Sequence, residues 1–321
     1  METKHDSVLL AEAIDSLAVA AGDTVVDATL GGAGHFRALL GKLGPQGTLV
    51  GIDADGDAVG RARAAEASVR EETGSRATVV IAHDNFRNLS TILDEAGIDT
   101  IDKALFDLGW SSFHLSSGRG FSFKTDEPLL MTYGEPGEGV ETAADIVNTA
   151  PEETLADIFF TYGEERFSRQ IAKSIAQQRK QKQIITTHDL VRAIEAGTPS
   201  WYQHRKIHPA TKVFQALRIA VNDEFGALRD GLSAALSRLS IGGRVAVITF
   251  HSIEDRIVKT MLRDAVQDGY GSLVAKKPLV PSAREQAANP RSRSAKLRVF
   301  ERGAASPKAT PVRINNIFSY L

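Results

Sequence analysis

The stretch Thr24-Val-Val-Asp27, followed by Ala28-Thr-Leu-Gly-Gly-Ala-Gly-His35, is a short apolar run that ends at an acid and passes into a glycine-rich turn. Such a run predicts a buried strand. Glycines after it let the backbone approach a ligand closely, because no Cβ intervenes. In an open α/β sheet, ligands lie beyond the carboxyl ends of the strands. The stretch therefore predicts the first strand of such a sheet, with a ligand site at its end.

Strand and helix patterns alternate in the first and last parts of the chain. Further apolar runs predict strands at 48–53, 77–82, 103–107 and 243–250. Helical stretches at 35–42 and 58–71 separate the earlier strands, which implies βαβ units and parallel pairing. The predicted fold class is therefore α/β, a doubly wound, Rossmann-like sheet.

A long segment without strand patterns interrupts this alternation. Residues 116–139 are rich in Gly, Ser and Pro, which predicts a loop. Helical patterns follow at 154–162 and 164–180, and Thr187 is predicted to cap another helix. The sequence then predicts one long helix over 211–228 before the last strand.

Three segments follow from this organisation. Residues 1–114 would form the first part of the α/β domain, which holds the ligand site. Residues 115–207 would form an all-helical insertion, and residues 208–321 the second part of the domain. The end of that second part, 276–302, is rich in Lys and Arg.

The composition of the 321 residues excludes several classes of site. The chain has no cysteine, so disulfides, thiolate metal sites and cysteine nucleophiles are excluded. Its formal net charge is −2, so a nucleic-acid surface would have to be local. No apolar run approaches the roughly 20 residues of a membrane span, and no ligand cluster has metal spacing. We therefore expect a cytoplasmic protein without membrane association and without a bound metal.

The acids near the glycine turn favour one adenosine cofactor over another. Asp53 ends the second strand, where a carboxylate can accept both hydroxyls of a ribose. A dinucleotide fingerprint needs a third glycine where Arg37 stands. Asp27 would repel a pyrophosphate but suits the sulfonium and amino groups of S-adenosylmethionine. The pattern thus favours S-adenosylmethionine, although a structural turn with a capping Asp stays open.

Two further strand ends carry candidate residues. Phe86 follows the third strand, where it could pack against an adenine ring or belong to the core. Asp107 ends the fourth strand in Asp107-Leu-Gly-Trp-Ser-Ser112, a polar turn that faces the expected position of the methyl group. This turn indicates a catalytic role, with a simple capped turn as the alternative.

These residues belong to blocks that resemble the RsmH (MraW) family, bacterial N4-cytosine methyltransferases of small-subunit ribosomal RNA. The resemblance covers nearly the whole chain. Beside the turns quoted above, its blocks are His5-x-Ser-Val-Leu-Leu-x-Glu12, Gly51-Ile-Asp-Ala-Asp55, Arg119-Gly-Phe-Ser-Phe123, Tyr162-Gly-Glu-Glu-Arg166, Ile171-Ala-Lys-Ser-Ile175, His208 to Ile219, Phe250-His-Ser-Ile-Glu-Asp-Arg256 and Asn289 to Arg298.

The resemblance implies a fold, a reaction and a partner. The fold would be a class I methyltransferase sheet with an inserted helical domain that recognises RNA. The reaction would be S-adenosylmethionine-dependent N4-methylation of a cytidine in the decoding region of 16S ribosomal RNA, within the small ribosomal subunit. Whether the protein forms a homodimer stays open.

The resemblance also implies roles for particular residues. It places Ala33, Gly34, His35, Asp53, Phe86, Asp107 and His114 in the cofactor site, to which the pattern of the glycine turn adds Asp27 and Gly32. At His114 this chain departs from the family, which usually has Gln there, and at Leu130 and Thr132 the family usually has Asp and Arg. These departures put the contact at His114 in doubt, and we assign no catalytic role to Leu130 or Thr132.

Catalytic and substrate-binding candidates complete the predicted site. Asp107, Ser111 and Ser112 would orient the cytosine amine. His251 and Glu254 are catalytic candidates on the resemblance, with a helix cap as the alternative reading. The predicted RNA contacts are Arg119, Arg218, Arg291 and Arg293, because guanidinium groups suit phosphates.

Two other functions remain open on the sequence alone. One is a methyltransferase of the same fold that acts on another RNA or on a small molecule. The other is a protein that binds an adenosine cofactor and RNA without catalysis. The large insertion and the basic segment favour RNA over a small molecule, because a small-molecule enzyme rarely needs so much docking surface.

Overall fold

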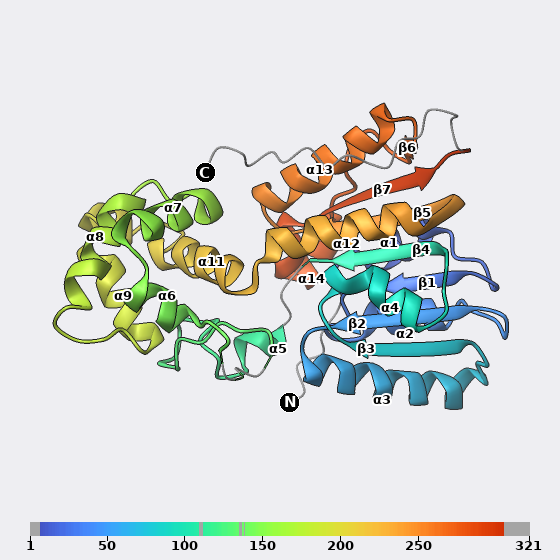
Figure 1. The fold of residues 1–321 in the computed structure, drawn as a ribbon, viewed down its shortest axis with the longest axis horizontal. Helices are drawn as coiled ribbons and strands as arrows, with labels where there is room; N and C mark the ends of the chain where they lie inside the picture. The colour runs from blue at the N-terminus through green and yellow to red at the C-terminus, as the bar shows by residue number, and fades with distance from the viewer. Residues whose placement is uncertain (1–6, 109–111, 135–136, 138, 305–321) are drawn as a thin grey trace. The chain divides into compact units, whose positions relative to one another are not determined.

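A computed structural model describes residues 7–108, 112–134, 137 and 139–304 of the chain. The chain divides into two compact units (Figure 1). The first, here called the sheet unit, comprises Met1–Trp110 and Phe225–Leu321, and the second, the helical unit, comprises Ser111–Glu224. Among the described residues, no helix is long and apolar enough to cross a membrane.

The sheet unit is built on a seven-stranded sheet in the order β3-β2-β1-β4-β5-β7-β6. Its strands are β1 (Thr24–Asp27), β2 (Thr48–Asp53), β3 (Thr78–His83), β4 (Ile101–Asp107), β5 (Leu239–Thr249), β6 (Gly271–Leu273) and β7 (Lys296–Arg302). Strands β1 to β5 are parallel, whereas β7 is antiparallel to both of its neighbours. The strand order reverses between β1 and β4, which is where open α/β sheets bind their ligands.

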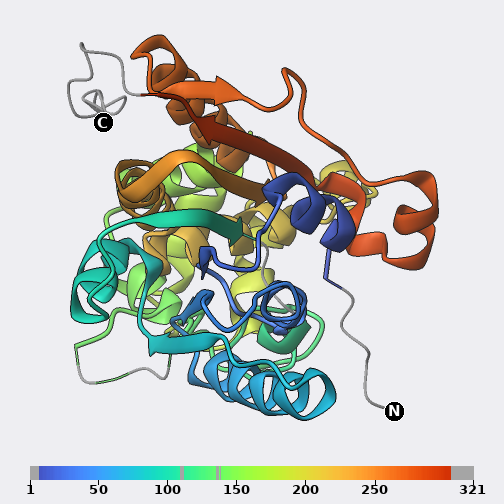
Figure 2. The same ribbon diagram turned by 90° about the vertical axis from the view of Figure 1, so that its right-hand side faces the viewer.

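Helices cover both faces of this sheet, so the doubly wound prediction is confirmed. One face packs against α1 (Leu10–Leu17), α2 (Gly34–Leu40) and α3 (Gly56–Thr73). The other packs against α4 (Leu89–Glu95), α12 (Glu224–Arg238) and α13 (Ser252–Gln267). Figures 1 and 2 show α3 along the β3 edge and the β6–β7 pair at the opposite edge. This strand order agrees with the doubly wound, Rossmann-like sheet expected from the sequence.

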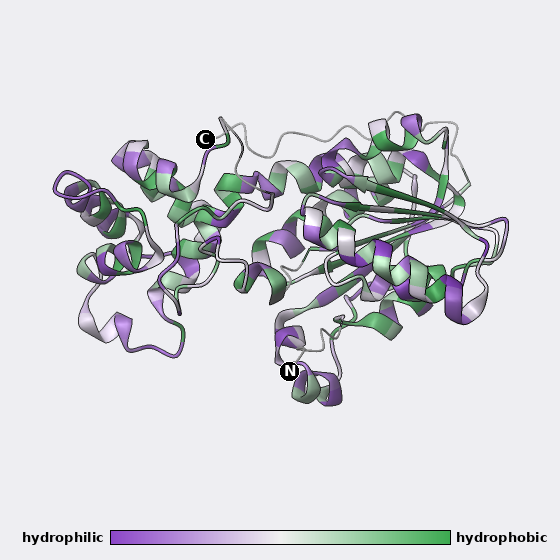
Figure 3. Cartoon of the chain, turned by 90° about the horizontal axis from the view of Figure 1, so that it is seen from below, coloured by the Kyte–Doolittle hydropathy of each residue, from purple (hydrophilic) through white to green (hydrophobic). Residues whose placement is uncertain are grey.

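The helical unit has its own apolar core. It contains α5 (Ser112–Leu115), α6 (Ala143–Thr149), α7 (Glu152–Gly163), α8 (Ser168–Gln178), α9 (Thr187–Ala196), α10 (Ser200–Gln203) and α11 (Pro209–Asn222). The only extended pairing among its described residues is an isolated bridge between Pro128 and Thr186. Green and purple alternate around these helices in Figure 3, as expected for amphipathic helices that share a core.

The prediction of a single helix over 211–228 is wrong, because the helix is interrupted at Asp223. This residue adopts a left-handed conformation with φ of 43° and ends α11, and α12 then starts at Glu224. Val213, Phe214 and Leu217 of α11 are buried in the core of the helical unit. The boundary between the units therefore lies after Glu224, beyond the predicted end of the insertion at residue 207.

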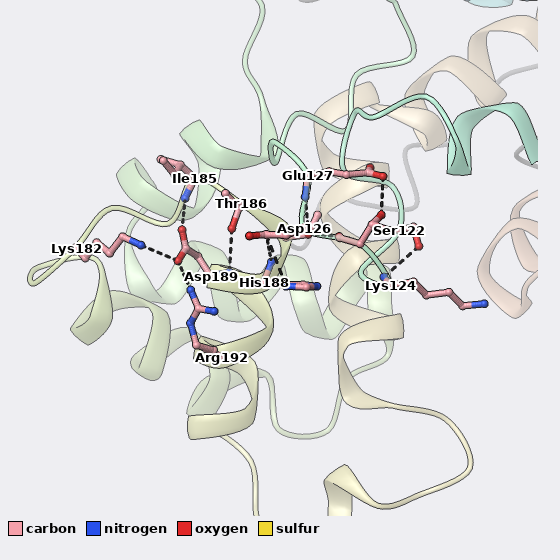
Figure 4. Close-up of polar contacts among 12 residues, drawn as sticks. Ser122, Lys124, Asp126, Glu127, Lys182, Ile185, Thr186, His188, Asp189 and Arg192 are labelled. Atoms are coloured by element: carbon pink, nitrogen blue, oxygen red, sulfur yellow. Dashed lines mark hydrogen bonds and ion pairs between the residues drawn. The ribbon is translucent and has the colours of Figure 1, made fainter.

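The start of α9 differs from the prediction by one residue. Thr186, not Thr187, is the N-cap, and its side chain accepts a hydrogen bond from the Asp189 backbone. The Thr187 hydroxyl instead donates to the Thr125 carbonyl at 2.7 Å. Asp126 accepts a hydrogen bond from the His188 backbone at 3.1 Å (Figure 4). These contacts tie the start of α9 to the segment at Thr125 and Asp126, 62 residues earlier in the chain, which local sequence could not indicate.

Part of the basic segment 276–302 is internal rather than solvent-facing. It forms α14 (Ala283–Ala288), the 3₁₀ helix η2 (Pro290–Ser294) and strand β7. In β7, Arg298 and Lys296 donate to the two carboxylate oxygens of Asp255 at 2.7 and 2.9 Å. Burial opposes the charge on Asp255, but these hydrogen bonds hold its pKa below the usual value. The pair of cations therefore joins β7 to α13.

Removal of one of these cations is expected to destabilise the fold. Arg298→Met should lower the free energy of unfolding by about 2 kcal/mol, because a largely buried carboxylate loses a charged hydrogen bond. The pKa of Asp255 is depressed in the folded protein, whereas it is about 4 in the unfolded chain. The difference in the free energy of unfolding between wild type and variant should therefore be present at neutral pH. It should disappear as pH falls below about 4 and through the depressed pKa. Urea unfolding measures the loss, with Arg284→Met on the exposed side of α14 as the control. Equal losses in both variants would contradict the assignment.

Candidate cofactor and catalytic site

Three carboxylates end adjacent strands at the point where the strand order reverses. Asp27 ends β1, and its neighbours in the sheet, β2 and β4, end at Asp53 and Asp107. Asp27 pairs in register with Gly51 and Leu105, so both neighbouring strands run two residues further. Asp27 thus lies at the base of a notch, with the other two acids at its rim.

The buried side chain of Asp27 has surroundings that favour a positively charged group beside it. Its side chain is fully buried, and the Thr29 backbone donates to Oδ1 at 3.2 Å. Among the described residues, Oδ2 has no hydrogen-bond partner. Burial raises the pKa of Asp27 well above its usual value, and repulsion from Asp107 and Asp53 raises it further. The hydrogen bond from Thr29 acts in the opposite direction and lowers the pKa. A cation beside Oδ2 would relieve both the burial and the repulsion.

Asp53 positions the glycine turn. Its Oδ2 accepts from the Gly31 backbone and its Oδ1 from the Asp55 backbone, both at 2.9 Å. On the other side of the turn, Arg61 of α3 donates to the Gly31 carbonyl at 2.8 Å. A carboxylate oxygen can accept two hydrogen bonds. These contacts are therefore compatible with the predicted contact to ribose hydroxyls.

The turn itself depends on small residues. Gly31 and Ala33 have positive φ values of 46° and 62°, and Ala33 precedes the first residue of α2. A Cβ at Gly34 would lie 2.1 Å from the Ser7 hydroxyl oxygen, so a larger residue here would require the Ser7 side chain to move. Gly32 lies between these residues in the same turn. Ser7 was not among the predicted site residues, although it belongs to the block His5–Glu12 that carries the family resemblance.

Asp107 and His35 meet across the same edge. His35 is buried on α2, and its Nδ1 lies 3.5 Å from Oδ2 of Asp107. The Asp107 backbone donates to the Thr29 hydroxyl at 2.7 Å. Thr29 therefore contacts both Asp27 and Asp107, a role that the sequence reasoning missed. Its polar side chain directly after a strand-ending acid was the available signal.

Phe86 has one clear packing role. Its ring meets that of Phe106 edge to face, with the centroids 5.7 Å apart. A Cβ at Gly231 of α12 would lie 2.6 Å from the Phe86 ring, so α12 also packs closely against it. Phe86 is only half-buried. A contact to adenine stays a prediction beside this core contact.

His251 and Glu254 form the N-terminal cap of α13. The two side chains and backbones exchange hydrogen bonds as a capping box, and Oε2 of Glu254 also accepts from the Phe250 backbone at 2.9 Å. His251 Nε2 lies 2.9 Å from Oε1 of Glu254. Glu254 is buried. The cap accounts for both residues structurally, and their catalytic role stays a prediction.

Three predicted residues lie inside the helical unit, each with internal contacts. His114 packs between Phe121 and Tyr133, with ring centroids 5.4 and 5.1 Å away. Arg119 is buried and donates to the Tyr133 carbonyl. Arg218 is buried and donates to both oxygens of Glu224 at 2.7 and 2.9 Å. Their contacts to cofactor or RNA stay predictions.

The remaining predicted residues differ in exposure. Arg291 and Arg293 are exposed on η2 of the sheet unit. Ser111 lies outside the described residues, and Ser112 is described only as the start of α5. Besides His114, two residues depart from the family pattern: Thr132 is buried and donates to the Gly134 carbonyl at 2.8 Å, whereas Leu130 is half-buried.

The sheet topology, the glycine turn and the orphaned buried oxygen of Asp27 together define an S-adenosylmethionine-dependent methyltransferase. The chain belongs to the MraW methylase family, whose family model matches residues 2–303. The predicted family and the predicted cofactor are therefore confirmed.

Relatives of known name extend over nearly the whole chain. The chain is 48% identical over 301 residues to the ribosomal RNA small subunit methyltransferase H of Deinococcus deserti, covering 93% of each. It is 43% identical over 313 residues to the protein of the same name from Streptococcus mutans, covering 93% of this chain and 97% of that one. A solved rRNA methylase from Streptococcus thermophilus matches 90% of this chain and 93% of its own, at 14% identity and a TM-score of 0.41.

Proposed function

We propose that this protein transfers a methyl group from S-adenosylmethionine to the N4 atom of a cytidine in the decoding region of 16S ribosomal RNA, within the small ribosomal subunit. The observation that carries the methyl-transfer site is the buried Asp27, whose Oδ2 has no hydrogen-bond partner among the described residues and which ends its strand between those of two further acids. The names of the relatives support the small ribosomal subunit as the source of the substrate.

The sheet unit would hold the cofactor through residues at its strand ends. Asp27 would face the positive groups, Asp53 the ribose hydroxyls, and the backbone of Gly32, Ala33 and Gly34 would line the turn. When bound, the cofactor supplies an electrophilic methyl group on a sulfonium. The burial of Asp27 strengthens its attraction for that charge, because few water molecules screen it.

Asp107 would act on the nucleophile. The exocyclic amine of cytosine is a poor nucleophile, since its lone pair is delocalised into the ring. Its proton becomes more acidic as the carbon–nitrogen bond forms, so a well-placed carboxylate can accept it. His35 and Thr29 hold Asp107 in place. Ser111 and Ser112 would orient the amine beside it, which places reacting atoms at attack distance.

RNA contacts would come from both units. The exposed Arg291 and Arg293 would bind phosphates, because their guanidinium groups face solvent. Arg218 and Arg119 would act differently, since both donate to internal acceptors. They would shape the helical unit, which recognises the RNA, rather than contact phosphates directly.

Loss of the Asp53 carboxylate is expected to weaken cofactor binding. Asp53→Ala should raise the Kd for S-adenosylmethionine roughly 10-fold or more, because it removes both an acceptor for ribose hydroxyls and the acceptor for Gly31. Calorimetric titration measures the change. Asp57→Ala, which removes an exposed acid from α3, is the control. Unchanged affinity in Asp53→Ala would remove this residue from the site.

The direct test of the proposal is methylation of small ribosomal subunits that lack the modification. The protein is incubated with labelled S-adenosylmethionine, and the modified base is then mapped. We expect label on N4 of one cytidine of the decoding region. Label on a ring carbon or a ribose hydroxyl would contradict the N4 assignment, and label only on another RNA or a small molecule would contradict the substrate.

A further inference from the structure

Two aromatic rings pack around one exposed tryptophan on the helical unit. The side chain of Trp201 on α10 is 57% exposed. Its ring centroid lies 5.6 Å from that of Tyr202 and 6.0 Å from that of Phe167, both edge to face. Phe167 and Tyr202 are 4.7 Å apart. Two further rings therefore hold the exposed indole in place.

Arginines lie over the same rings. The guanidinium carbon of Arg166 is 4.9 Å from the Phe167 centroid and 5.5 Å from the Trp201 centroid. That of Arg205 is 5.6 Å from the Tyr202 centroid. We call these five residues, Arg166, Phe167, Trp201, Tyr202 and Arg205, the Trp201 platform. It combines aromatic rings with two arginines, whose guanidinium groups stay positively charged at any ordinary pH.

The Trp201 platform is preorganised from beneath. The Tyr202 hydroxyl donates to both oxygens of Glu165 at 2.9 Å, and Glu165 also accepts from the Phe167 backbone at 2.8 Å. Burial, together with Glu165, raises the pKa of Tyr202 to about 12, so the hydroxyl stays a donor. Gln203 fixes the end of α10 by donating to the Glu195 carbonyl at 2.7 Å. The rings therefore need little ordering when a ligand arrives.

The charges around the platform favour an anionic partner. Arg169 and Lys206 add two more exposed cations next to Arg166 and Arg205 in sequence. Of the two neighbouring acids, Glu165 is fully buried beneath Tyr202 and only Glu164 is exposed. The exposed indole of Trp201 flanked by arginines resembles surfaces that bind single-stranded nucleic acid, where bases stack and phosphates pair with cations.

We propose that the Trp201 platform binds unpaired nucleotides of the RNA substrate, with a base stacked on the Trp201 indole and flanking phosphates on Arg166 and Arg205. This surface rests on the proposed function, since RNA is the substrate there. It specifies that the helical unit recognises single-stranded rather than duplex RNA. Stacking is tolerant of base identity, so the platform would hold the strand without reading its sequence.

Tryptophan fluorescence tests the stacking directly and without methyl transfer. The chain has two tryptophans, so Trp110→Phe leaves Trp201 as the only reporter. Titration with an unpaired RNA oligonucleotide should quench this emission, and added salt should weaken the effect. The same oligonucleotide annealed to its complement should quench much less. RNA binding that is detected by filter retention but leaves Trp201 emission unchanged would overturn the proposal.

Substitution of Trp201 provides the second arm. Trp201→Ala should weaken binding of the unpaired oligonucleotide roughly 10-fold and raise the KM for the ribosomal substrate while kcat is retained. Trp201→Phe, which keeps a stacking ring, should recover most of the affinity. Phe160→Ala removes another exposed aromatic of the same unit, 65% exposed on α7, and should change neither value.

The fluorescence and substitution experiments distinguish failure of this proposal from failure of the proposed function. Wild-type KM and affinity in a folded Trp201→Ala variant would overturn the platform and leave RNA methylation standing. Quenching of Trp201 by unpaired RNA, together with no methyl transfer to any RNA, would leave the platform standing and overturn the proposed function. Thermal melting of each variant shows that the helical unit is folded.

Discussion

Asp107→Ala is expected to lower the rate of methyl transfer between about 100- and 10,000-fold, the range typical of a lost general base. The carboxylate ends β4 at the sheet position where the strand order reverses, and it is oriented by His35 on one side. Without it, no carboxylate at this strand end would accept the amine proton as the carbon–nitrogen bond forms. Single-turnover transfer from labelled cofactor to undermethylated small subunits measures the rate.

Comparison of the change in cofactor affinity with the change in rate decides whether Asp107 acts in the methyl-transfer step or in cofactor binding. Cofactor affinity in Asp107→Ala should fall much less than the rate, and calorimetric titration gives that affinity. Asp107→Asn keeps the shape but not the charge, so it should be nearly as slow. Asp57→Ala serves again as the exposed-acid control. A variant that keeps its rate once saturated with cofactor would show that Asp107 serves binding only.

Asp27→Asn is expected to move stability and cofactor affinity in opposite directions. The pKa of Asp27 is raised by burial and by two nearby acids. Above the unfolded value of about 4 the unfolded chain releases this proton while the folded chain retains it, so ionisation costs the fold stability as pH rises. Neutral Asn avoids that cost. The cofactor-free variant should therefore melt at a higher temperature than wild type at pH 7, and the difference should vanish below pH 4.

The same substitution should weaken cofactor binding roughly 10- to 100-fold, because the positive groups lose a buried negative partner. In wild type, binding should also release a proton, since a cation beside Asp27 lowers its pKa again. Calorimetry in two buffers of different ionisation enthalpy detects that proton, and Asp27→Asn should not release it. An Asn variant with wild-type affinity and no gain in melting temperature would contradict the role of Asp27.

The strands of the site were predictable because their signals are local. The run 48–53 forms β2 with those bounds, and the other predicted strands differ from the structure only at their ends. Strand β7 was missed, since Lys296, Arg298 and Arg302 give it the appearance of a charged tail. The charges of Lys296 and Arg298 are compensated by Asp255, which lies on α13 about 40 residues earlier and cannot be paired with them from periodicity alone.

The candidate residues also divide into those that could be predicted from the sequence and those whose contacts only the structure gives. Asp27, Asp53 and Asp107 could be named from sequence, because each ends an apolar run and parallel strands end at one edge of the sheet. Arg119 and Arg218 were predicted to contact RNA from their residue type and the family blocks. The structure gives both an internal acceptor, the Tyr133 carbonyl for Arg119 and the Glu224 carboxylate for Arg218, which only the folded chain could decide.

The sequence by itself determined strands β1 to β5, the glycine turn between Asp27 and His35, and the family of the chain, because the signal for each lies in neighbouring residues. The tertiary structure decided what these residues experience. It buries Asp27 between two other acids, brings His35 of α2 to Asp107 of β4, and sets Trp201 over Phe167 from a distant helix. Burial and charge pairing arise from segments far apart in the chain. They therefore exist only once the fold has closed.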